Sequence, residues 1–168
     1  GLEVGDSRAV FKNVDVDMRQ YKKLKMFLHA EALPTGSQLQ DDQMKAFIRF
    51  GNDFTNNYYQ VEIPLKVTSP GAIDAEDVWP EANEINLSMA LLTAMKVRSL
   101  SINFTTLPDG VYYPDDDTSL PDGDGDPTLR LGIKGTPNFG LVRTLMVGIK
   151  NNHIDRVRGE VWFNELRQ

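Results

Sequence analysis

Three aspartates at alternate positions are the clearest candidates for chemistry in this chain. Asp122, Asp124 and Asp126 are separated by single glycines, and a run of three aspartates begins a few residues earlier at Asp115. Carboxylates spaced in this way can converge on one Ca²⁺, which takes six to eight oxygen ligands and tolerates loop geometry. The segment is not an EF-hand, because Pro127 stands where that loop needs glycine for its sharp turn. Two interpretations stay open: a calcium site, or an acidic loop exposed to solvent.

Five aromatic residues fall in segments that the pattern predicts to be loops. They are Phe54, Tyr58, Trp79, Tyr112 and Tyr113. Aromatic faces beside asparagine and aspartate can form a sugar-binding platform, in which apolar stacking is combined with polar contacts that set the orientation. The alternative is that these rings fill the core or cover its ends. The five residues are therefore candidate ligand or protein contacts.

Catalytic motifs are absent from the sequence. His29 and His153 are the two histidines, and neither has a partner at metal-ligand spacing; His29 is expected to be a packed or hydrogen-bonded surface residue of its strand. No Gly-x-Ser-x-Gly elbow or phosphate-binding glycine loop occurs. The chain has no cysteine, which excludes disulfides and thiol nucleophiles. We expect a protein that is not an enzyme and that has no cofactor other than Ca²⁺ in the calcium interpretation.

Length and charge narrow the class of protein further. A chain of 168 residues with 40% hydrophobic residues is large enough for one domain with a real core. The net charge of −6 argues against nucleic acid and anionic membrane surfaces as partners, because neither attracts an acidic protein. The apolar stretches are far shorter than the roughly 20 residues of a spanning helix, and no signal peptide is recognisable. We expect residues 1–168 to form a single soluble domain that does not itself span a membrane.

The elements that must position these residues are mostly strands. Apolar and polar residues alternate, as strands that cover a core on one face require, in residues 23–32, 44–50, 59–65, 129–134, 141–149 and 157–163, with edge segments at 9–11 and 14–18. Pro64 indicates an edge position or a bulge. Residues 88–100 instead have helical spacing, with Ser88 as the N-cap. Residues 84–87 before them are either a short strand or the approach to this helix.

Many short strands and one helix predict a mainly β fold. The expected architecture is an antiparallel β-sandwich of the jelly-roll, galactose-binding-like type with one principal helix. This analogy concerns the fold and does not decide the function. The predicted core consists of Leu24, Met26, Leu28, Ile48, Val61, Ile63, Leu145, Val147, Val161 and Phe163.

Several stretches also carry a family resemblance. The series Lys-Gly-Thr-Pro-Asn-Phe-Gly-Leu-Val-Arg-Thr-Leu-Met-Val-Gly-Ile-Lys-Asn (residues 134–151) is followed by Glu-Val-Trp-Phe-Asn-Glu-Leu-Arg (residues 160–167). Together with segments in residues 15–31, 47–65 and 78–84, it resembles the SprA (Sov) family of gliding-motility and secretion proteins. The matching stretches span nearly the whole chain, and none of them is a catalytic motif.

The resemblance implies a location and a set of partners. It implies a soluble domain excised from a much larger protein, the outer-membrane translocon of the type 9 secretion system, in the cell envelope. Its partners would be secreted passenger proteins or other translocon subunits, and its role would be structural or interactive rather than catalytic. The alternative, from the jelly-roll analogy and the loop aromatics, is a carbohydrate-binding module of a surface protein. The sequence leaves open the interaction face and the side of the membrane.

Overall fold

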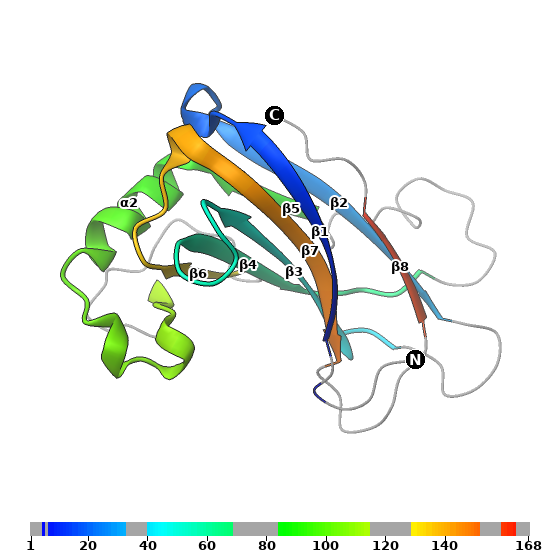
Figure 1. Cartoon of the computed structure of the whole chain (residues 1–168). Helices are drawn as coiled ribbons and strands as arrows, with labels where there is room; N and C mark the ends of the chain where they lie inside the picture. Colours follow the sequence, from blue (N-terminus) through cyan, green and yellow to red (C-terminus); the bar gives the residue numbers. More distant parts are fainter. Residues whose placement is uncertain are drawn as a thin grey trace.

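Antiparallel strands make up most of the structure (Figure 1). The computed structural model describes residues 5, 7–32, 40–68, 84–114, 129–151 and 159–163. The strands are β1 (Ser7–Val16), β2 (Lys23–Ala32), β3 (Met44–Gly51), β4 (Tyr58–Pro64), β5 (Glu84–Ser88), β6 (Arg130–Lys134), β7 (Val142–Asn151) and β8 (Gly159–Phe163). The principal helix is α2 (Met89–Ser99), and the short 3-10 helices are η1 (Met18–Gln20), η3 (Phe104–Thr106), η4 (Pro108–Gly110) and η6 (Phe139–Leu141). The prediction of a mainly β, antiparallel fold with one principal helix is confirmed.

The strands form two sheets. The larger has five strands in the order β1-β7-β3-β4-β6, and the smaller has three in the order β5-β2-β8. In the larger sheet Ile48 of β3 lies opposite Val147 of β7 on one side and Val61 of β4 on the other. Strands from both ends of the chain, β1 and β7, therefore lie side by side at one edge (Figure 1). The jelly-roll, galactose-binding-like layout stays a prediction.

One core joins the two sheets. Along β3, buried and half-buried residues alternate, which is the pattern of a strand with one face against a core. The same core cluster contains Leu28 of β2, Ile85 of β5 and Ile63 of β4, so the apolar faces of both sheets contribute to it. Consequently the outer face of the five-stranded sheet carries the alternate, mostly polar residues of each strand.

The predicted core residues are partly confirmed. Leu28, Ile48, Val61 and Ile63 are each at most 2% exposed. Leu145 and Val147 of β7 are only partly buried and pack against this core. The side chains of the remaining four predicted core residues lie outside the described part of the structure: Leu24, Met26, Val161 and Phe163.

The helix begins where the sequence predicts. The Ser88 hydroxyl accepts a hydrogen bond from the Leu91 N–H at 3.4 Å, which confirms Ser88 as the N-cap. Met89, Leu92 and Met95 are buried on the side of the helix that covers one end of the core. The chain then returns through η3 and η4, and Tyr112 exchanges two backbone hydrogen bonds of 2.8 and 2.9 Å with Ile133 of β6. This return places residues 102–113 beside the outer face of the large sheet.

Pro64 occupies an edge position within β4. The Leu65 N–H donates to the Met44 carbonyl at 2.9 Å, so the nitrogen of the preceding Pro64 faces away from β3. On that side the pairing of β4 with β6 ends at Glu62. The proline therefore removes no ladder hydrogen bond, as the sequence-based prediction requires.

Candidate functional site

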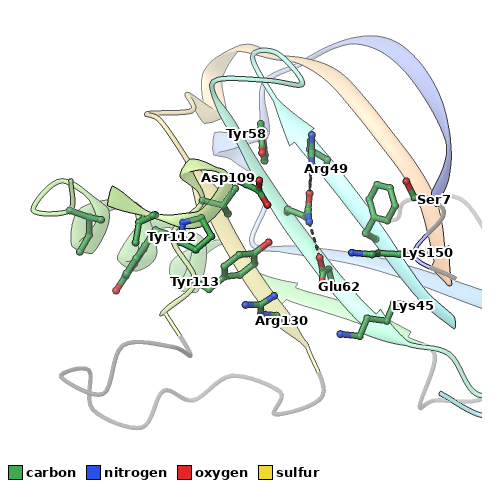
Figure 2. Close-up of a pocket in the computed structure, with 17 residues that line it drawn as sticks. Ser7, Lys45, Arg49, Tyr58, Glu62, Asp109, Tyr112, Tyr113, Arg130 and Lys150 are labelled. Carbon is green, nitrogen blue, oxygen red and sulfur yellow. Dashed lines mark hydrogen bonds between the residues drawn. The ribbon is translucent and has the colours of Figure 1, made fainter. Parts of the chain in front are cut away.

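A cavity of about 890 Å³ lies between the outer face of the five-stranded sheet and the chain that follows α2 (Figure 2). Its sheet side is formed by Lys45, Phe47, Arg49, Tyr58, Gln60, Glu62, Arg130 and Lys150, with Gly5 and Ser7 at the start of the chain. Its other side is formed by Ile102, Leu107, Pro108, Asp109, Val111, Tyr112 and Tyr113. The volume is in the range typical of ligand pockets. The cavity is the candidate functional site.

A chain of polar contacts fixes the centre of the sheet side. Arg49 donates from Nε and Nη2 to Oε1 of Gln60 at 2.9 and 2.7 Å, and from Nη1 to the Phe54 carbonyl at 2.8 Å. Gln60 in turn donates to Glu62 Oε1 at 2.9 Å. The Arg49 guanidinium also lies over the Tyr58 ring, 4.1 Å from its centroid. Arg49 is thus held by an amide oxygen, a carbonyl oxygen and a ring, none of which carries a negative charge.

Two tyrosines in the cavity stay neutral at ordinary pH. Burial raises the pKa of Tyr58 above its usual value, although the nearby Arg49 acts in the opposite direction. Burial is also the largest cause that raises the pKa of Tyr113. The Arg130 guanidinium lies 3.7 Å from the centroid of the Tyr113 ring. One face of each ring is therefore covered by an arginine.

Glycines in two strands give the rings room to rest on the sheet. A Cβ at Gly132 would lie 2.7 Å from the Tyr113 ring and 2.9 Å from a methyl group of Val111. A Cβ at Gly148 would lie 2.5 Å from the Phe47 ring. These distances are shorter than carbon–carbon contacts allow, so any other residue would displace the aromatic walls. The corresponding signal in the sequence is a glycine at an outward position of an alternating strand.

The cavity has a positive excess within an acidic chain. Among the described residues that line it are four cationic side chains and the two carboxylates of Glu62 and Asp109, whereas the whole chain has a net charge of −6. Lys45 and Lys150 are direct partners in the β3–β7 ladder and share the outer face. Figure 2 shows these two lysines on one side of the cavity and the tyrosines on the other. None of the four cationic residues was a candidate from the sequence.

The predicted aromatic contacts divide into three groups. Tyr58, Tyr112 and Tyr113 all line the cavity. Phe54 does not line it: its ring packs edge-on against Phe11 with centroids 5.0 Å apart, and only its carbonyl supports Arg49. Trp79 lies outside the described residues. Whether these residues contact a ligand or a protein stays a prediction.

The calcium hypothesis falls on residues that the structure does not describe. Asp122, Asp124 and Asp126 lie outside the described ranges, so their role in binding Ca²⁺ stays a prediction. Within the described ranges, no group of three histidine or acidic side chains could hold a metal ion. The Nδ1 atom of His29 lies 3.2 Å from the Thr68 hydroxyl, which confirms the expected hydrogen bond, but the residue is buried, so its predicted surface position is wrong.

Hydrogen bonds between two polar loops hold together the strands that line the cavity. In the β3–β4 loop, Asn52 accepts from the Asn138 N–H at 2.8 Å and donates to the Leu141 carbonyl at 2.7 Å, both in the β6–β7 connection. Asn57 accepts from the Thr136 N–H at 3.1 Å. These contacts unite two of the stretches that carry the family resemblance. The register of the central strands is thereby fixed at one end of the sheet.

Asp53 organises the β3–β4 loop internally. Its carboxylate accepts hydrogen bonds from the backbone N–H groups of Thr55, Asn56 and Asn57 and from the Asn57 side chain. Desolvation raises the pKa of Asp53, but these hydrogen bonds outweigh it and lower the pKa to about 2. The loop therefore depends on the ionised carboxylate.

The fold and the cavity together define a mainly β domain with a pocket on one sheet face. A family model described as motility related/secretion protein, SprA_N, matches residues 1–168. The chain belongs to this family, which confirms the resemblance seen in the sequence. A search of curated proteins returned no match. Among the described residues, no helix has the length and apolar character needed to cross a membrane.

Proposed function

We propose that this chain is a non-catalytic interaction domain of the outer-membrane translocon of the type 9 secretion system. It would contact secreted passenger proteins or other translocon subunits during protein secretion and gliding motility, in the cell envelope. The observation that carries the proposal is a preformed cavity on a sheet face in a chain whose whole length matches a family of motility and secretion proteins.

The composition of the cavity suits binding better than catalysis. Nucleophilic catalysis needs a hydroxyl or thiol within hydrogen-bond reach of a base. No histidine is among the described residues that line the cavity, and Glu62 is bonded to the Gln60 amide rather than to a hydroxyl. Burial raises the pKa of Tyr58 and Tyr113, which makes both poor nucleophiles.

The support for the cavity is rigid. Its sheet side comes from β3, β4, β6 and β7, which are paired with one another and locked by the loop contacts of Asn52 and Asn57. A surface of this kind binds without large backbone movement. The domain would therefore present one fixed site to its partners.

The test uses charge reversal at the cavity in the producing cells. Lys150→Glu changes an exposed side chain of the cavity, and Lys22→Glu makes the same change at an exposed position outside its lining. We expect Lys150→Glu to reduce passenger secretion and gliding at least fivefold, with the control close to wild type. Normal secretion by a Lys150→Glu variant present at the wild-type level would contradict the proposal.

The carbohydrate-binding alternative needs a free aromatic face for stacking. Arg49 and Arg130 each cover a ring face, of Tyr58 and of Tyr113. These contacts remove two of the aromatic faces that stacking would use, so they do not favour this alternative over the secretion role. A glycan array with the purified chain provides the check, and a strong hit on a neutral sugar would favour the carbohydrate-binding module.

A further inference from the structure

Two lysines without an anionic partner face the cavity. Lys45 and Lys150 are directly opposite on neighbouring strands, a position in which Cβ atoms are about 4.5–5.5 Å apart and like charges repel. Within the described ranges, neither ammonium group has an ion-pair partner. The neighbouring position on β1 is Ser7, which brings no charge. Among the described residues, no negative group is therefore directly opposite either lysine in these ladders.

A third cation lies farther along the same strand. Arg49 is four residues from Lys45 on β3 and points to the same face, so the two positions are about 13 Å apart along the extended chain. Its hydrogen-bond acceptors, Gln60 and the Phe54 carbonyl, are neutral. Phe47 lies between Lys45 and Arg49 and rests on Gly148. Along β3, the sheet side of the cavity thus presents a cation, an aromatic ring and another cation at intervals of two residues.

The two described carboxylates of the cavity are not ion-paired with the lysines, although Glu62 lies opposite Phe47 in the β3–β4 ladder and therefore diagonal to Lys45. Glu62 accepts from Gln60 and is opposite Arg130 in the β4–β6 ladder. Asp109 belongs to η4, on the other side of the cavity, where its negative charge helps to raise the pKa of Tyr58. Neither is paired with Lys45 or Lys150. A ligand that complements the sheet side of the cavity along β3 therefore has two separated negative charges and an apolar group between them.

We propose that the cavity binds an extended acidic peptide segment of a partner protein. In an extended peptide, side chains return to the same face every two residues, about 6.6–7 Å apart. An acidic residue, an apolar residue and a second acidic residue at positions i, i+2 and i+4 therefore match Lys45 with Lys150, then Phe47, then Arg49. An acidic sugar fits less well, because arginines cover a face of the Tyr58 and Tyr113 rings. The proposal rests on the proposed function, and it specifies the chemistry of the partner.

The direct test measures peptide binding by the purified 168-residue chain. The probe is a fluorescein-labelled, end-blocked peptide Glu-Ser-Leu-Ser-Glu, and its matched control is Gln-Ser-Leu-Ser-Gln. Fluorescence anisotropy at low salt should show binding at least tenfold tighter for the acidic probe. High salt should weaken that binding, because it screens the attraction between the charges.

Variants of the chain separate charge recognition from structural damage. Lys150→Gln should weaken binding of the acidic probe at least fivefold while maintaining or raising the melting temperature, because it removes the like-charge opposition to Lys45. Lys22→Gln, at an exposed position outside the cavity lining, should change neither quantity. Equal binding of both peptides, or full binding by Lys150→Gln, would overturn the proposal. Tighter binding of an oligogalacturonate than of the acidic peptide would also overturn it.

The outcomes also distinguish this inference from the proposed function. If the acidic probe does not bind but Lys150→Glu still blocks secretion, the peptide assignment fails and the secretion role stands. If the probe binds as expected but secretion is normal in Lys150→Glu, the peptide assignment stands and the secretion role fails.

Discussion

Gly135 should be the most sensitive glycine in the loops that lock the sheet. Its φ of +64° is in the left-handed region, and a Cβ added there would overlap the backbone carbonyl oxygen of Asn56. Gly110 is a matched control with nearly the same φ of +67°. The nearest atom to its Cβ would be Cε of Lys134 at 3.2 Å, the end of a flexible side chain. Alanine at the two positions therefore has the same backbone strain but different steric surroundings.

The expected loss of stability follows from these two contributions. A left-handed conformation costs a non-glycine residue about 1–2 kcal/mol, and this cost applies to both variants. At Gly135 the overlap also forces the loops apart and weakens the hydrogen bond from Thr136 N–H to Asn57, for which about 0.5–1.5 kcal/mol is typical. We expect Gly135→Ala to lower the free energy of unfolding by about 1.5–3.5 kcal/mol and Gly110→Ala by about 1–2 kcal/mol.

Urea unfolding of the purified variants measures both values, provided that the m-value stays constant. A third variant, Gly135→Asn, tolerates the left-handed backbone better than alanine but retains the Cβ overlap. It should therefore be more stable than Gly135→Ala but still less stable than the wild type. Equal losses for Gly135→Ala and Gly110→Ala would refute the close approach of the two loops.

Further predictions concern the loop and the core. The pKa of Asp53 in the folded state is about 2, below its ordinary value of 3.8. Its contribution to stability is therefore complete above about pH 4 and is lost as the pH falls toward 2. In urea unfolding curves measured over this pH range, Asp53→Asn should make the free energy of unfolding less dependent on pH. The buried Tyr59 hydroxyl has no hydrogen-bond partner among the described residues, so Tyr59→Phe should maintain or raise the melting temperature, and a clear decrease would contradict this. Ile63 is fully buried, so Ile63→Ala should lower the free energy of unfolding by about 2–5 kcal/mol in the same urea assay. A loss below about 1 kcal/mol would contradict this prediction.

The sequence predicts the strands and the helix well because their signals are local. Alternation predicted the central strands β3, β4 and β7, and a serine with helical spacing after it predicted the start of α2. At the N-terminus the prediction was wrong in detail: two segments, 9–11 and 14–18, are one strand, β1, and Met18 belongs to η1. The pairing of β1 with β7 shifts register between Asn13 and Val16, and this irregularity interrupts the alternation that the prediction followed.

The cavity could be predicted only in part. Tyr58, Tyr112 and Tyr113 were selected because of their residue type and loop surroundings, which are visible in the sequence. Lys45 and Lys150 could not be selected in this way, because each is an ordinary charged residue at an outward position of a strand. Only the order of β7 beside β3, and the register between them, place the two lysines opposite each other.

This arrangement links the stability of the domain to its proposed binding. Salt screens the repulsion between Lys45 and Lys150 in the free chain, and it equally screens their attraction to an acidic peptide. Rising salt should therefore stabilise the free chain and weaken the complex, whereas the peptide at low salt should raise the melting temperature by binding to the folded state. Lys150→Gln lacks the repulsion, so its stability should gain less from salt than that of the wild type. An equal salt-dependent gain in the two proteins would show that the lysine pair does not strain the sheet, and would remove the energetic reason for an anion at this site.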